Sequence, residues 1–174
     1  ARAHLEEGIA LYDPQEHRAL AFRAGIDPGV WCLSHAAQAL WLLGYPDQAL
    51  HRSHEALTLA RQLAQPFSLA FALDWAAWLH HLRREPQATQ DQAEAAMALC
   101  TEQGFAQLLA FGRLLRGWVL AARQQGEDGI AHMRQGLAAY QATGAAVGRP
   151  QYLALLAEAH GQVRQAEAGL AMLR

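Results

Sequence analysis

A degenerate internal repeat with a period near 39 residues constrains the fold of this chain most strongly. Four times, a helical pattern ends in a tight turn, and a small residue near the start of a second helical pattern follows. These small residues, 39, 41 and 37 positions apart, are Ala49, Ala88, Gly129 and Ala166. Seven positions after the first three, another small residue follows, at Ala56, Ala95 and Gly136. Seven residues make two helical turns, so each pair lies on one stripe where a neighbouring helix can approach closely.

Stacked helical hairpins are the fold that this repeat predicts. A single amphipathic hairpin cannot bury its apolar face, so neighbouring hairpins must cover one another. We therefore predict an all-α fold, a right-handed α-solenoid of about four antiparallel hairpins. An N-terminal orphan helix precedes them, because Ala1 and Gly8 repeat the seven-residue spacing. The predicted helices span residues 1–12, 28–43, 47–63, 66–82, 86–102, 105–124, 127–141, 149–160 and 163–173.

Residues 1–174 are expected to form a single domain that is a fragment of a larger protein. Ala1 already lies in a helical pattern, with no charged n-region followed by an apolar h-region. The segment from Asp13 to Asp27 is longer than a turn between helices requires. We expect an insertion at 13–27 that is functional or carries one or two turns of helix.

Composition argues against several classes of protein. With 52% apolar and 17% charged residues, the chain can bury a sizeable core, unlike a disordered segment. Its net charge of −2 and its scattered arginines argue against a nucleic-acid interface. The stretch from Pro28 to Pro46 lacks charged residues but contains polar ones, so we predict a buried helix, no membrane span and a cytoplasmic location. Cys32 and Cys100 lie in apolar patterns and are predicted to be buried free thiols.

The repeat resembles the tetratricopeptide (TPR) pattern, of which it keeps the small positions and little else. Four longer sequence motifs are more specific than this pattern: YDPQEHR at 12–18, LWLLGYPDQAL at 40–50, PFSLAFA at 66–72 and MRQGLAA at 133–139. They resemble the helical-repeat region that follows the ATPase module in large bacterial signalling proteins, many of which also carry a class III nucleotidyl cyclase or protein kinase domain. The resemblance implies a sensor or regulatory segment and transfers no catalytic residue.

Candidate partner-binding residues come from the helices that line the concave groove in this repeat type. They are Trp31, Gln38, Trp41, Asp74, His80, Arg113, Arg116 and Trp118. Trp41 is the preferred aromatic anchor, although most large aromatic residues in such helices pack in the core. Asp74 interrupts an apolar helix, so its carboxylate must face water or be paired. Arg113 and Arg116 share a helix face and could bind a partner's carboxylate, with a solvated face as the favoured alternative.

Local spacing suggests neither a metal site nor a catalytic group. His51 and His54 offer only two imidazoles on one face, and the neighbouring His80 and His81 point about 100° apart on a helix. A structural zinc site needs four ligands, and a catalytic one needs three. We therefore expect no enzymatic activity, no metal and no cofactor.

Function is accordingly predicted to be non-catalytic. The leading hypothesis is a protein-interaction or regulatory module of a bacterial signalling protein that binds a peptide, a helix or a neighbouring domain in its concave groove. One alternative is a structural spacer or self-association scaffold, which forms homo-oligomers. A second alternative is a small-molecule receptor with an apolar pocket.

Overall fold

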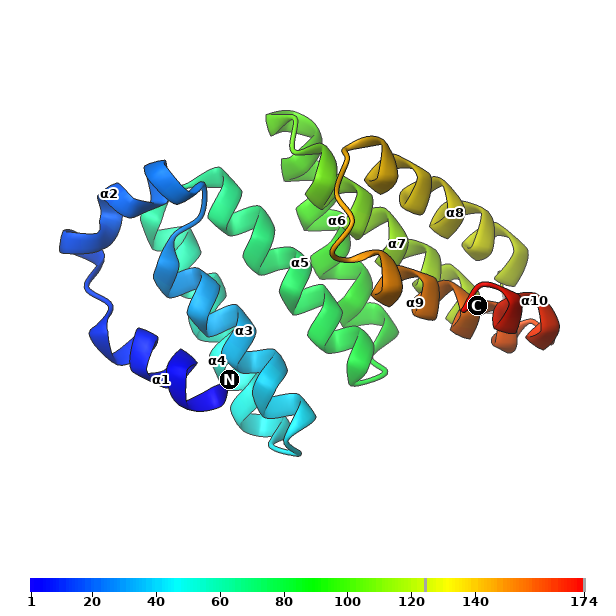
Figure 1. Ribbon diagram of the computed structural model, residues 1–174, viewed down its shortest axis with the longest axis horizontal. Helices are drawn as coiled ribbons and strands as arrows, with labels where there is room; N and C mark the ends of the chain where they lie inside the picture. The colour runs from blue at the N-terminus through cyan, green and yellow to red at the C-terminus, as the bar shows by residue number, and fades with distance from the viewer. Residues whose placement is uncertain (124, 174) are drawn as a thin grey trace.

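The chain is all-helical, as the repeat predicts. The computed structural model describes residues 1–123 and 125–173, apart from the side chains at positions 18, 22 and 24. These residues form ten helices and no strand. The helices are α1 (Arg2–Leu11), α2 (Pro14–Ala24), α3 (Pro28–Leu42), α4 (Pro46–Leu63), α5 (Pro66–Leu82), α6 (Pro86–Gln103), α7 (Ala106–Ala122), α8 (Gly126–Ala142), α9 (Arg149–Gln162) and α10 (Ala166–Ala171). Figure 1 shows them following one another along the molecule, with α1 near one end and α10 at the other.

Neighbouring helices pack in pairs, α3 with α4, α5 with α6, and α7 with α8. The first helices of the pairs also pack on one another in the order α3, α5, α7 and α9. Among the described residues, α4, α6 and α8 do not contact one another. We call the surface of α3, α5, α7 and α9 that points away from α4, α6 and α8 the first-helix face. Helix α1 packs against α3 much as α4 packs against α5.

The pairs repeat every 40 residues, without the drift that the small residues suggested. Three features share this interval. Helices α4, α6, α8 and α10 begin at Pro46, Pro86, Gly126 and Ala166. Among the described residues, left-handed backbone precedes α4, α6 and α10 at Gly44, Arg84 and Arg164, and left-handed backbone follows α4, α6 and α8 at Ala64, Gly104 and Gly144.

Three of the predicted small residues are out of register. In the second pair, Thr89 and Ala96 rather than Ala88 and Ala95 are fully buried. In the last pair, Gly169 rather than Ala166 is buried. Alanine is the most frequent residue of this chain. A small residue therefore lies near each expected position in any register, and only the turns define the repeat length.

The segment between residues 13 and 27 holds a helix of three turns, longer than predicted. The Asp13 carboxylate accepts two backbone N–H groups of the first turn of α2, at 2.7 and 3.3 Å. Pro14 occupies that turn, and Gly25 ends the helix in the left-handed conformation with φ 80°. Asp13-Pro14 is the same start signal as Asp27-Pro28, so the sequence did carry the information.

Asp27 joins three helices at the start of α3. It is fully buried, and its carboxylate accepts the backbone N–H of Val30 at 3.0 Å and the hydroxyl of Tyr12 at 2.9 Å. Its own backbone N–H donates to the hydroxyl of Ser68 on α5 at 2.9 Å. The link between α2 and α3 is thus attached to both α1 and α5.

Asp27→Ala is expected to lower the free energy of unfolding by about 2 kcal/mol, because it removes a helix cap and leaves the Tyr12 hydroxyl without its acceptor. Urea denaturation measures the loss. Asp13→Ala removes an exposed cap and is the matched control, with an expected loss of about 1 kcal/mol or less. Equal losses for the two variants would show that the buried contacts of Asp27 add no stability beyond that of the helix cap.

Small residues let α7 and α8 approach closely. A Cβ added to Gly129 would lie 2.6 Å from both the backbone nitrogen of Ala121 and the carbonyl oxygen of Gly117. Gly129 and Gly136 are both buried, seven residues apart on α8. The predicted stripe of close helix approach is confirmed for this pair of helices.

The remaining expectations about the core hold in part. Cys100 is buried, and burial raises the pKa of its thiol to about 12, whereas Cys32 is only half-buried. Within the described ranges, no helix has both the length and the apolarity needed to span a bilayer.

Candidate functional site

Helix geometry determines which side chains of α3 point to the first-helix face. Leu33 and Leu40 line the space between α1 and α4. Trp31 and His35 lie two residues on either side of Leu33, about 200° around the helix, so they point to the opposite side. The aromatic side chains of α3 and α5 meet there.

Five aromatic side chains form a row on this face, and we call them the aromatic row. The rings of Trp31 and His35 stack with centroids 4.0 Å apart, and His35 lies 4.7 Å from the ring of Trp75. Phe71 lies 5.6 Å from Trp75, one helical turn away. Trp78 follows Trp75 by three residues and so extends the row along α5.

The row is open to solvent at its α3 end and closed at its α7 end. Trp31 is 41% exposed, and the four other members of the row are half-buried. Beyond Trp78 the rings continue to Phe111 on α7 and Tyr152 on α9, at 5.9 and 5.3 Å, but these two side chains are buried. A partner can therefore reach the rings of α3 and α5.

The aromatic row carries no charge at neutral pH. The Nδ1–H of His35 donates to the carbonyl oxygen of Trp31, at 2.9 Å. Burial lowers the pKa of His35, so its ring is neutral. The row thus offers contiguous apolar ring faces with a single histidine among them.

A polar cluster lies on the same face between α5, α7 and α9, and we call it the Glu158 cluster. The Oε1 atom of Glu158 accepts the indole N–H of Trp118 at 3.0 Å and the amide N–H of Gln162 at 3.3 Å. The guanidinium of Arg84 donates to the same oxygen and lies over the Trp118 ring, 6.0 Å from its centroid. Arg84 thereby reaches across α7 from the turn between α5 and α6 to α9.

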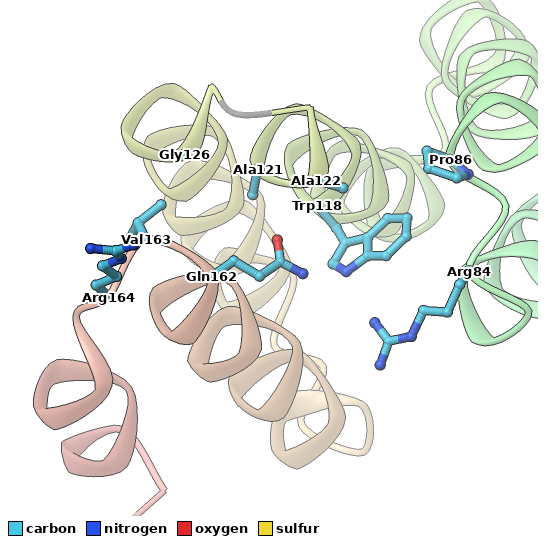
Figure 2. Close-up of a pocket in the computed structure, with 9 residues that line it drawn as sticks. All are labelled: Arg84, Pro86, Trp118, Ala121, Ala122, Gly126, Gln162, Val163 and Arg164. Carbon is cyan, nitrogen blue, oxygen red and sulfur yellow. The ribbon is translucent and has the colours of Figure 1, made fainter.

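An open depression of about 600 Å³ adjoins the Glu158 cluster. Figure 2 shows Arg84 and Pro86 on one side of it, and Val163 and Arg164 on the other. The indole of Trp118 lies between them, with the Gln162 amide directed toward it. The wall of the depression therefore combines apolar and polar side chains, with the cationic side chains of Arg84 and Arg164 at opposite edges.

Three predicted residues take part in this face. Trp31 belongs to the aromatic row. Gln38 lies under it, buried, and its amide donates to the carbonyl oxygen of Trp75 at 3.1 Å, so it positions α3 against α5. Trp118 is only 2% exposed, with the Arg84 guanidinium over its ring, and it forms the floor of the Glu158 cluster.

Two predicted residues lie outside the row. Trp41, the preferred anchor, is half-buried and packs against the cluster of Ala37, Leu40, Ala49 and Leu79. His80 lies about 200° around α5 from Trp78 and is paired with Glu85, its Nδ1 2.6 Å from the carboxylate. Both contribute to packing or turn structure, and neither adjoins the aromatic row.

Arg113 and Arg116 lie on the other side of the molecule. They line an open groove of about 780 Å³ whose floor is α7 and whose walls are α6 and α8. Both are exposed and share one helix face, as predicted. Trp118 lies about 200° from Arg116, so the two arginines and this tryptophan cannot contact the same ligand.

Asp74 contradicts the prediction that it must face water or be paired. It is fully buried, and neither carboxyl oxygen has a hydrogen-bond partner among the described residues. Its Oδ1 points toward α7 and lies 3.4 Å from where a Cβ on Gly112 would be. Burial raises the pKa of Asp74 well above its usual value, so the carboxyl is kept neutral in the core and cannot bind a partner.

Several residues of this face were not predicted from the sequence. His35, Phe71 and Trp75 share helical spacing with Trp31 or with one another, and this spacing would have identified the row once the register of α3 and α5 was known. Arg84 and Glu158 are 74 residues apart, and only packing brings them together.

Comparison with protein-family models and with curated proteins finds no match for this chain. Nowhere in the described part of the chain do three or more His, Cys, Asp or Glu side chains converge as metal ligands would. The site is therefore characterised by its geometry alone: ring faces on α3 and α5, and one carboxylate held beside an indole.

Proposed function

We propose that this chain is a TPR-like helical-repeat module, a right-handed α-solenoid, that binds a peptide or helix of a partner protein or of a neighbouring domain on its first-helix face. The observation that carries the proposal is the aromatic row, in which four uncharged, partly exposed rings from two adjacent helices lie side by side and Trp78 continues them along α5. The 40-residue repeat of helix starts and turns supports the solenoid architecture.

Physical chemistry favours binding at these rings. An aromatic side chain can bury 150 to 250 Å² at an interface, and aromatic residues are enriched among the side chains that dominate binding energy. Contiguous exposed apolar surface on a folded protein usually marks an interaction site. The neighbouring polar groups of Glu158 and Arg84 would then orient the partner.

The resemblance to bacterial signalling proteins extends this proposal to regulation in the cytoplasm. A partner that binds one of two conformations more tightly shifts the equilibrium toward it, and thereby changes an effector on the same chain. No catalytic role is proposed.

A second candidate function, self-association, is favoured by the turn between α3 and α4. Leu42, Leu43 and Tyr45 are 79%, 55% and 44% exposed there, and such a patch is costly to leave in water. Light scattering over a range of concentrations tests this: Leu42→Asp is expected to abolish any dimer, and a dimer unchanged by it would exclude this patch.

The test of the proposed function selects peptides from a displayed random library and measures their affinity for variants. Trp31→Ala and Trp75→Ala are expected to weaken binding at least tenfold, because each removes a ring from the row. The double variant Arg113→Ala with Arg116→Ala alters the opposite side and is the control, with unchanged affinity. Peptides that bind both row variants as tightly as wild type would exclude the aromatic row, and circular dichroism confirms that each variant is folded.

A further inference from the structure

We infer that Glu158 and the indole of Trp118 form a receptor for a basic side chain of the partner, preferably an arginine, and that Arg84 occupies this receptor as an intramolecular competitor. The inference rests on the proposed function, since it assigns a chemical class to the segment that would lie on the first-helix face. It also gives a reason why an arginine occupies position 84, where the backbone is left-handed.

The carboxylate of Glu158 is held in place without Arg84. The indole N–H of Trp118 and the amide of Gln162 both donate to Oε1, so two neutral groups orient the carboxylate from the side of α7 and α9. Oε2 accepts no hydrogen bond from the described residues. The side chain remains 30% exposed, so a second donor can approach it from solvent.

Aromatic rings form the surroundings of this carboxylate. Trp118 packs edge to face against His81 at 4.4 Å, and His81 lies 4.8 Å from Trp78 of the aromatic row. Burial lowers the pKa of His81 to about 4, so its ring is neutral at pH 7 and adds no positive charge. The Glu158 carboxylate meets the N–H edge of the Trp118 indole, while the face of the same ring lies under a guanidinium, so the carboxylate and the ring face together favour a cation.

Arg84 occupies the receptor at little net gain in free energy. Its side chain is 63% exposed, and ion pairs this exposed contribute at most about 1 kcal/mol. Its backbone has φ +60°, the left-handed conformation, which costs a residue with a side chain about 1 kcal/mol or more. The equivalent turn before α4 has Gly44 at this position, so the turn itself does not require an arginine.

Glu158 is more preorganised than Arg84, and this difference favours a basic ligand over an acidic one. When Arg84 leaves, Glu158 stays oriented by Trp118 and Gln162, whereas the released guanidinium becomes a mobile exposed group. A fixed carboxylate loses less entropy on binding than a free arginine would. Arg164, the other cation of the depression, is on the far side of Val163 and does not approach the indole (Figure 2).

Guanidinium suits this receptor better than ammonium. It is planar, so it can lie along the indole and donate two parallel hydrogen bonds to one carboxylate. Arg84 shows that the space admits a guanidinium over Trp118. We therefore expect arginine to bind more tightly than lysine.

The test uses blocked amino acids and needs no knowledge of the natural partner. N-acetylarginine amide, the lysine analogue and the glutamate analogue are titrated while the indole N–H resonance of Trp118 is followed by NMR, assigned by its loss in Trp118→Phe. Arg84→Ala is expected to bind the arginine probe at least fivefold more tightly than wild type. Arg164→Ala changes the equivalent turn position on the other side of the depression and is expected to leave that affinity unchanged.

Adding Glu158→Gln to Arg84→Ala is expected to abolish the gain. An unchanged affinity in Arg84→Ala, an equal gain in Arg164→Ala, or preferential binding of the glutamate probe would overturn the inference. This test and the library experiment can fail separately. If the row variants lose peptide binding but Arg84→Ala shows no gain, the proposed function stands and only the preference for a basic side chain is lost.

Discussion

Replacing Gly129 by alanine is expected to lower the free energy of unfolding by about 3 kcal/mol. The added Cβ would lie 2.6 Å from two backbone atoms of α7, on Ala121 and Gly117, and 3.0 Å from the Cβ of Ala121. Backbone atoms cannot rotate away, so α7 and α8 would have to separate and lose packing along their length. The gain in helix propensity from glycine to alanine, about 1 kcal/mol, is too small to compensate.

Gly161→Ala is the matched control for this variant. Gly161 also lies in a helix, α9, but an added Cβ there would meet no atom within 4 Å. Only the propensity change remains, so stability is expected to rise by up to about 1 kcal/mol. Urea denaturation measures both variants, and a Gly129→Ala protein as stable as wild type would show that α7 and α8 are not as close as described.

Asp74→Asn is expected to make the protein more stable than wild type at pH 8 while leaving stability at pH 4 almost unchanged. Burial raises the pKa of Asp74 in the folded protein, whereas an aspartate in the unfolded chain titrates near pH 3.9. The folded state therefore holds the proton more tightly. Its stabilising contribution is complete below about pH 3.9 and is lost as pH rises through the folded pKa, by up to about 1.4 kcal/mol per pH unit.

The measurement is the free energy of unfolding in urea from pH 4 to pH 9 for wild type and variant. Asparagine has nearly the same shape as protonated aspartate and cannot ionise, so the difference between the two curves isolates Asp74. Asp91→Asn, at an exposed position on α6, is expected to give a curve parallel to wild type. If Asp74→Asn is also parallel, the carboxyl has a partner or solvent access that the packing does not show.

Local sequence signals defined the helices well. Proline at the start of α3, α4, α5 and α6, and glycine after α6, placed most helix ends within two residues of those observed. The same signals, Asp13-Pro14 and Gly25, bound α2, which at three turns is longer than the one or two turns expected between residues 13 and 27. These ends can be predicted from sequence, because capping depends on residues close in sequence.

Orientation of the side chains could be predicted less well. The sequence predicts the positions of the first helices but not their rotation, so it favours Trp41 over Trp75 and places Arg113 on the wrong side. A rotation error of 100° exchanges a half-buried position for a fully buried one, as Trp75 and Asp74 show. In a chain this rich in alanine, small residues do not determine that rotation.

Three properties follow from local sequence: the chain is helical, most helices begin and end where expected, and small residues allow α7 and α8 to pack closely. Each of these depends on interactions within one helix, one turn or one hairpin. Three others follow from packing: which rings form the aromatic row, that Asp74 is buried without a hydrogen-bond partner among the described residues, and that Arg84 meets Glu158. Those outcomes depend on packing between residues tens of positions apart, where each helix can rotate to bury whichever face its neighbours leave uncovered.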